Sequence, residues 1–147
     1  MLQVSTKFKE LILGSSSFAS IFNNGRILVY SGAQPASANF EPTGTLLAEI
    51  STNGTPWAVN GAGGGGLQFA QSGAYVLAAS PWRMRVVADG TAGWFRLYGP
   101  ALDPDELSYA WPRIDGAIGS ELILENPALV AGQSIPVQQF TYTIPGA

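Results

Sequence analysis

The sequence contains no histidine and no cysteine, and only 12% of its 147 residues are charged. Without histidine the chain cannot build a Ser-His-Asp triad or most zinc and iron sites, and without cysteine it has neither disulfides nor thiol chemistry. Catalysis would have to rely on Asp, Glu, Lys or Tyr side chains, or on a borrowed cofactor. We therefore expect a protein that is not an enzyme and that uses no cofactor or metal.

The few charges are slightly unbalanced, because the chain has seven lysines and arginines but ten aspartates and glutamates, which gives a net charge of −3. No long basic run is present, so we expect no nucleic-acid partner. No apolar run is long enough to span a bilayer, so we expect no membrane partner. A charged share this far below the usual value of about 25% predicts a surface that a homo-oligomer, a dimer or trimer, or a larger assembly partly covers.

Residues 1–25 have a helical pattern. Their apolar side chains fall on two short helical faces, one formed by Phe8, Leu11 and Ile12 and the other by Phe18, Ile21 and Phe22. Gly14 and three serines separate the two faces, and Asn-Asn-Gly at 23–25 ends the second. Two interpretations of this apolar stripe stay open: it covers the protein's own sheet, or it is an arm that packs on a neighbouring subunit or another partner.

Residues 26–147 have the pattern of one β domain. Strand-like runs recur between glycine and proline turns, among them 26–32, 45–51, 82–88, 93–99 and 136–145. Within 82–88, Trp82 and Met84 alternate with Arg83 and Arg85, as in a strand with one buried face. About eight or nine such runs predict a mainly β fold, namely an antiparallel, jelly-roll-like β-sandwich with a short helical N-terminal segment.

Five glycines crowd the stretch GAGGGG at 61–66. A phosphate-binding loop needs a lysine and then a serine or threonine after its last glycine, followed by a helix. Here Leu67 and Gln68 follow and lead into a strand-like run, so we expect neither a P-loop nor a dinucleotide site. The glycines predict a tightly turned or flexible connection between strands.

Acidic residues cluster in LDPDELSY at 102–109. A calcium loop or an acid/base pair would use such a cluster, but the further ligands and the glycine of an EF-hand loop are missing. The local pattern favours a short helix, with Asp103 as its N-cap, Pro104 at its first position and Glu106 closing a capping box.

Arginines recur on two of the predicted strands, as Arg83, Arg85 and Arg96. They would form a basic patch for a sulfated or phosphorylated ligand if they shared one exposed face. Surface ion pairs are the favoured interpretation, with partners drawn from Asp89, Glu121 and Glu125.

Nine residues are candidates for contact with a partner, and none is expected to be catalytic. Six are the apolar residues of the N-terminal stripe. The other three are Trp57 and Trp111, which stand beside prolines in loop-like stretches, and Tyr109. Aromatic side chains in such positions stack on sugars or pack against another protein.

Several stretches of the chain resemble a group of tailed-bacteriophage virion proteins. The resemblance begins with SIFNNGRILVYSGAQPASANFEPTGTLLAEIS and continues through GGGLQF and DGTAGWFRLYG. It ends with RIDGAIGSELILENPALVAGQSIPVQQFTYTIP, so it covers about residues 18–145. The segment LDPDELSYAW is longer than the usual connection of that group at this place.

The resemblance implies a non-enzymatic capsid cement, or decoration, protein on the outer surface of a virion that assembles in the host cytoplasm. Its partners would be the major capsid protein and further copies of itself, and it would bridge neighbouring capsid subunits. The alternative is a tail, collar or fibre-associated virion protein that binds a host glycan through Trp57, Tyr109 and Trp111. A carboxylate-based glycan hydrolase is a weaker third hypothesis, because the few acids lie mostly in turns.

Overall fold

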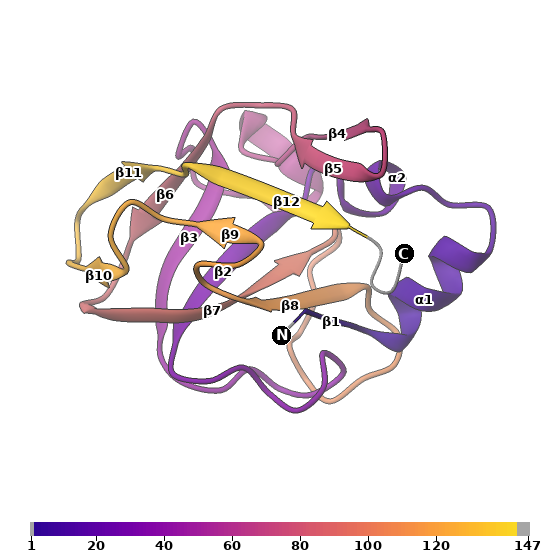
Figure 1. Cartoon of the computed structure of the whole chain (residues 1–147), viewed down its shortest axis with the longest axis horizontal. Coiled ribbons are helices and arrows are strands. Elements are labelled where there is room, and N and C mark those ends of the chain that lie inside the picture. The colour runs from indigo at the N-terminus through magenta and orange to yellow at the C-terminus, as the bar shows by residue number, and fades with distance from the viewer. Residues whose placement is uncertain (1, 144–147) are drawn as a thin grey trace.

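The computed structural model describes residues 2–143 and shows a mainly β protein with short helices (Figure 1). The elements are β1 Gln3–Val4, α1 Thr6–Leu13, α2 Phe18–Phe22, β2 Arg26–Ser31, β3 Leu46–Thr52, η1 Val59–Gly64, β4 Phe69–Ser72, β5 Tyr75–Ala78, β6 Trp82–Val86, β7 Gly90–Tyr98, β8 Arg113–Ala117, β9 Leu122–Ile123, β10 Ala128–Leu129, β11 Ser134–Pro136 and β12 Gln139–Thr143. The ends of the predicted strand 136–145 and of the predicted domain 26–147 lie outside the described residues, as does residue 1.

Two antiparallel sheets account for the named strands of residues 2–143. The larger has the order β1-β8-β7-β2-β3-β6-β11, with β10 paired to β7, and the smaller has the order β4-β5-β12-β9. The alternation expected in 82–88 is present in β6, where Trp82, Met84 and Val86 are buried and the two arginines between them are half-buried. The mainly β, antiparallel prediction is confirmed, whereas this strand order does not establish the jelly-roll connection.

The core lies between the two sheets, which gives the sandwich arrangement. Phe69 of β4 and Phe140 of β12 meet Trp82 of the larger sheet with ring centroids 5.3 and 5.1 Å apart. Phe140 also contacts Phe95 of β7, at 6.3 Å. In Figure 1, β12 correspondingly crosses over the strands of the larger sheet.

The N-terminal helices belong to this core. Ser5 caps α1 by accepting from the Phe8 amide, and Ser17 and Ser20 form a reciprocal capping box at α2. The core includes four residues of the predicted stripe, namely Phe8, Phe18, Ile21 and Phe22. Leu11 and Ile12 are half-buried against it. Within this single chain the stripe therefore packs on the protein's own core.

The glycine run forms a close backbone connection, as predicted. Gly63 and Gly64 have φ values of 81° and 89°, which favour glycine. A Cβ on Gly66 would lie 2.6 Å from the Asn24 Cα, so the two backbones must nearly touch there. The Asn24 amide donates to the Leu67 carbonyl, and the Leu67 amide donates to Gly25, which fixes the approach.

Candidate functional site

The candidate site is a surface that two loops present at one side of the molecule. Loop 33–44 and loop 100–112 expose four large apolar side chains, which we call the clamped surface: Phe40, Leu102, Leu107 and Tyr109, with exposed fractions of 43, 57, 57 and 62%. The loops touch, because the Ser108 amide donates to the Asn39 carbonyl at 2.9 Å. Both run along the lower edge of Figure 1. Contiguous exposed apolar patches mark surfaces that contact other molecules, so apolar side chains on two touching loops make this a candidate contact surface.

Arg113, at the start of β8, holds the two loops together. Its fully buried guanidinium donates to both Asp103 oxygens, with Nε–Oδ2 and Nη2–Oδ1 distances of 2.6 and 2.7 Å. Nη2 also donates to the Glu106 carbonyl, and Nη1 donates to the Asn39 carbonyl. One side chain therefore fixes loop 100–112 and links it to loop 33–44.

The short helix predicted to begin at Asp103 is wrong. The Asp103 carboxylate accepts from the Asp105 amide at 2.8 Å, which is a local turn, and its remaining capacity is taken by Arg113. Asp105 has a left-handed φ of 62°, which a helix cannot accommodate. A charge-assisted bidentate pair with a distant arginine is stronger than a hydrogen bond that caps a local helix. The pair therefore determines the backbone conformation at Asp103.

A second buried arginine anchors the same loop. Arg96 of β7 is fully buried and binds both Asp115 oxygens at 2.7 and 2.9 Å. Its Nη1 also reaches Asp105 of the loop at 3.3 Å. The Tyr98 hydroxyl donates to Asp105 at 2.7 Å and lies 3.2 Å from the Tyr30 hydroxyl. Loop 100–112 is thus held over this face of the sheet at Asp103 and at Asp105.

Strand register brings these charges together. Arg96 stands opposite Asp115 in the pairing of β7 with β8 and opposite Leu28 in the pairing of β7 with β2. Cross-strand partners share one face of a sheet, so the ion pair lies on the same face as the aromatic stack of Tyr30 and Trp94, whose ring centroids are 4.7 Å apart. This face carries a second apolar cluster, separate from the core between the sheets.

The predicted pairing of the surface arginines is wrong. Arg96 is buried, and it binds Asp115 rather than an acid of the surface turns. Arg85 binds Glu49 at 3.0 Å, and Arg83 donates to Ser134 at 2.7 Å. The partners lie on adjacent strands or loops that only the sheet register identifies.

Burial shifts the ionisation of this cluster. It raises the pKa of Tyr30 to about 12, and it raises the pKa of Tyr98 still further, with the neighbouring Tyr30 and Asp105 adding to the effect. Burial also raises the pKa of Asp115, a rise that Arg96 opposes. Burial alone would lower the pKa of Arg96, but its bonds with Asp115 outweigh burial and raise it. Arg96 therefore keeps its charge at any ordinary pH.

Alkaline pH is expected to destabilise the fold through Tyr30 and Tyr98. Both pKa values are higher in the folded state than the value of about 10 in an unfolded chain, so the contribution of each tyrosine is complete below about pH 10 and falls as pH rises above it. For Tyr30 the loss is complete near pH 12, and for Tyr98 it continues above that pH. Each group should lower the free energy of unfolding by about 1.4 kcal/mol per pH unit in that window. Urea unfolding across this range measures the slope. In Tyr30→Phe the free energy of unfolding should fall less steeply with pH, by the contribution of one tyrosine. An unchanged dependence on pH would contradict the raised pKa of Tyr30.

The sequence-predicted contact residues are dispersed. Tyr109 is exposed on the clamped surface, and Trp111 lies half-buried in the same loop, where its carbonyl accepts from Ser5. Trp57 is half-buried elsewhere, since its indole donates to the Asn24 carbonyl and the Arg26 guanidinium lies 4.5 Å from its ring centroid. The structure therefore brings together two of the three aromatic candidates, and the six residues of the stripe lie on the helices.

The carboxylates of the site have a structural role, because each of them is paired with an arginine. Asp103, Asp105 and Asp115 each bind an arginine, so their charges are neutralised by fixed partners. Among residues 2–143, no group of three potential ligand side chains is placed to hold a metal ion. Within the same residues, no helix is long and apolar enough to cross a membrane. The arrangement fixes loop shape and supports contact with another molecule.

Comparison with known proteins adds no relative to this description. No protein-family model matches the chain, and neither a curated protein nor a solved structure does. The resemblance to virion proteins therefore rests on the sequence stretches quoted above, and the structural argument for function rests on the clamped surface.

Proposed function

We propose that the chain is a non-enzymatic structural protein of a tailed-bacteriophage virion, a capsid cement protein that binds the outer shell and bridges major capsid subunits. The observation that supports this most strongly is the clamped surface, because large apolar side chains are exposed on loops that the buried arginines Arg113 and Arg96 hold in place. The resemblance of the sequence and its low charge point the same way. The partners are the major capsid protein and further copies of the chain.

Rigid loops favour such a role. Ordering a free loop on binding costs roughly 1–2 kcal/mol per residue, which subtracts from the affinity. Arg113 and Arg96 order loop 100–112 during folding, so apolar burial by Leu107 and Tyr109 contributes to binding with little such loss. Many copies bound to a repeating shell then stabilise it together, even when each contact is weak.

One observation favours the alternative of a tail, collar or fibre-associated protein. Tyr109 is 62% exposed, and an exposed aromatic ring is able to stack on the apolar face of a sugar. Such a protein would be present in a few copies at one end of the particle. A cement protein would be spread over the shell, so copy number separates the two functions.

Quantitative mass spectrometry of virions purified from the phage that encodes this chain tests the proposal. We expect a copy number close to that of the major capsid protein. A few copies per particle would reject the cement function and favour the tail-associated alternative. Complete absence from virions would reject both.

A pair of variants tests the surface itself, by rebinding to particles that lack the protein. Leu107→Asp is expected to weaken binding about tenfold or more, because a contact residue at the centre of an interface contributes at least about 1–2 kcal/mol. Val87→Asp is the matched control, since Val87 is also exposed, at 51%, but lies outside the clamped surface. Equal binding by both variants would show that the clamped surface is not the contact.

A further inference from the structure

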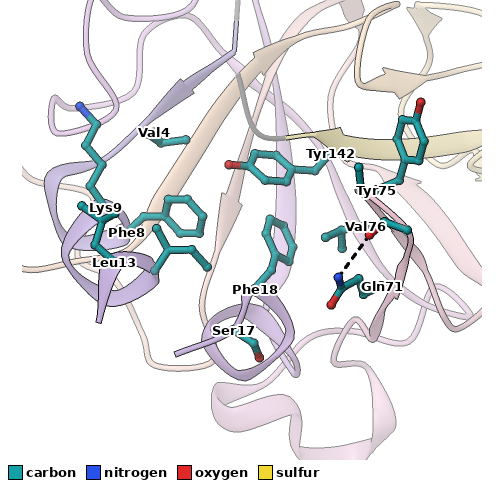
Figure 2. Close-up of a pocket in the computed structure, with 13 residues that line it drawn as sticks. Val4, Phe8, Lys9, Leu13, Ser17, Phe18, Gln71, Tyr75, Val76 and Tyr142 are labelled. Atoms are coloured by element: carbon teal, nitrogen blue, oxygen red, sulfur yellow. Dashed lines mark hydrogen bonds between the residues drawn. The ribbon is translucent and has the colours of Figure 1, made fainter. Parts of the chain in front are cut away.

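A pocket of about 510 Å³ lies between α1, α2, the β4–β5 hairpin and β12 (Figure 2). Its walls are mostly apolar and include Val4, Phe8, Phe18 and Val76. Leu13 stands at the rim and is 85% exposed. The volume is within the range of about 300–1,000 Å³ that is typical of sites for small molecules. This pocket is separate from the clamped surface.

Tyr142 places an unused hydroxyl group in the pocket. The side chain is only 6% exposed, and its ring packs on Phe8 and Phe18 with centroid distances of 6.1 and 4.8 Å. No residue of the described range 2–143 forms a hydrogen bond with its hydroxyl. In Figure 2 the hydroxyl points toward Val4. The hydroxyl oxygen is not among the fully buried, unpartnered side-chain atoms of residues 2–143, so it reaches solvent at the pocket and is available to a ligand that offers an acceptor.

Lys9 supplies the pocket's charge. It is the single charged residue among the side chains that line the pocket, in a chain whose net charge is −3. The neighbouring acid on α1, Glu10, faces Lys7 at 3.8 Å, and within residues 2–143 no carboxylate pairs with Lys9. In Figure 2 Lys9 extends past Val4, the residue toward which the Tyr142 hydroxyl also points. In that view the ammonium and the hydroxyl stand on either side of Val4.

Of the other polar side chains of the lining, Ser17 and Gln71 are engaged, whereas Tyr75 is 52% exposed and its hydroxyl lies on the opposite side of Figure 2 from Lys9. Ser17 accepts from the Ser20 amide at 3.1 Å, and Gln71 donates to the Gly73 carbonyl at 3.2 Å. Away from Val4 the pocket therefore offers mainly apolar surface, whereas its Val4 end offers one hydroxyl donor and one cation. An occupant that fits both ends has a long apolar chain and one anionic, hydrogen-bond-accepting head.

We propose that this pocket binds a single-chain carboxylate amphiphile of the fatty-acid class. The carboxylate lies between the Tyr142 hydroxyl and the Lys9 ammonium, and the alkyl chain lies against Phe8, Phe18 and Val76. A cationic head would be repelled by Lys9, and a neutral alcohol would lose the attraction to it. A second copy of the chain is the competing occupant, and it would have to bury Leu13 in the same place.

Calorimetric titration of the full chain with carboxylates from octanoate to dodecanoate tests the proposal. Each buried methylene contributes about 0.8 kcal/mol, so the Kd should fall about fourfold with each added methylene. Dodecyltrimethylammonium is the control amphiphile, and it should bind at least about tenfold more weakly than dodecanoate. Absence of saturable binding, or equal binding of the two head groups, would overturn the proposal.

Two variants locate the head group. Tyr142→Phe should weaken dodecanoate binding about tenfold, because it removes a hydrogen bond to a charged acceptor. Lys9→Gln should weaken it up to about fivefold, as expected for an exposed charge, whereas Lys7→Gln on the same helix should not change it. Unchanged binding in both pocket variants would overturn the proposal. Light scattering that shows a dimer which dodecanoate does not dissociate, together with no heat of binding, would assign the pocket to a second copy.

Discussion

Replacing Arg113 with methionine is expected to lower the free energy of unfolding by about 3–5 kcal/mol, because removal of one partner leaves a buried charge without compensation. The Asp103 carboxylate would lose both of its guanidinium hydrogen bonds, and the carbonyls of Asn39 and Glu106 would lose a donor. The two loops of the clamped surface would separate as well. Urea denaturation measures the stability, and limited proteolysis within loop 100–112 measures the loss of order.

Arg85→Met is the matched control for this prediction. Arg85 also forms an ion pair, with Glu49, but its side chain is 37% exposed and Glu49 keeps Arg26 as a second partner. Its loss should cost no more than about 1 kcal/mol. Adding Asp103→Asn to Arg113→Met should recover part of the stability, since the unpaired charge is then absent. If Arg113→Met lowered the free energy of unfolding no more than Arg85→Met does, the pair of Arg113 with Asp103 would not be important for the stability of the fold.

The sequence was sufficient to predict the parts of the fold that depend on local pattern. Period-two alternation in β6 and the turn residues around it are consequences of neighbouring positions, and both were predicted. The helical character of residues 6–13 and 18–22 was predicted from their apolar spacing. These features need no knowledge of which strands pair.

The site could not be predicted in the same way, because its contacts depend on the strand register. Arg96 and Asp115 are cross-strand partners of β7 and β8, and nothing near either residue in the sequence specifies that pairing. Local cues at Asp103 indicated a helix cap, but a partner ten positions away, Arg113, binds its carboxylate more strongly. The available signal was a charged residue in the middle of a predicted strand, as in WFRLY and RID, because such a residue needs a buried partner or an exposed face.

The pocket has a related origin. Phe8 and Tyr142 come from opposite ends of the described chain, yet their rings pack edge to face with centroids 6.1 Å apart. The sequence placed each residue on an apolar face of its own element, but it did not show that the two faces meet. Only the sandwich arrangement brings α1 to the end of β12.

Phe22→Ala is expected to lower the free energy of unfolding by about 3–5 kcal/mol, as for other large core residues. Phe22 is fully buried, with its ring 5.5 Å from Phe8 and 5.0 Å from Phe18. Leu13→Ala is the control on the preceding helix, because Leu13 is 85% exposed and should contribute less than about 0.5 kcal/mol.

This pair of variants distinguishes a core helix from an arm. If residues 1–25 packed on a neighbouring subunit, Phe22→Ala would leave the stability of the isolated monomer unchanged and would weaken assembly instead. If they belong to the core, the monomer itself loses stability, and denaturant unfolding at a concentration where light scattering shows only monomer detects the loss. We expect the second result, because Phe22 joins α2 to the aromatic cluster that α1 shares with the smaller sheet.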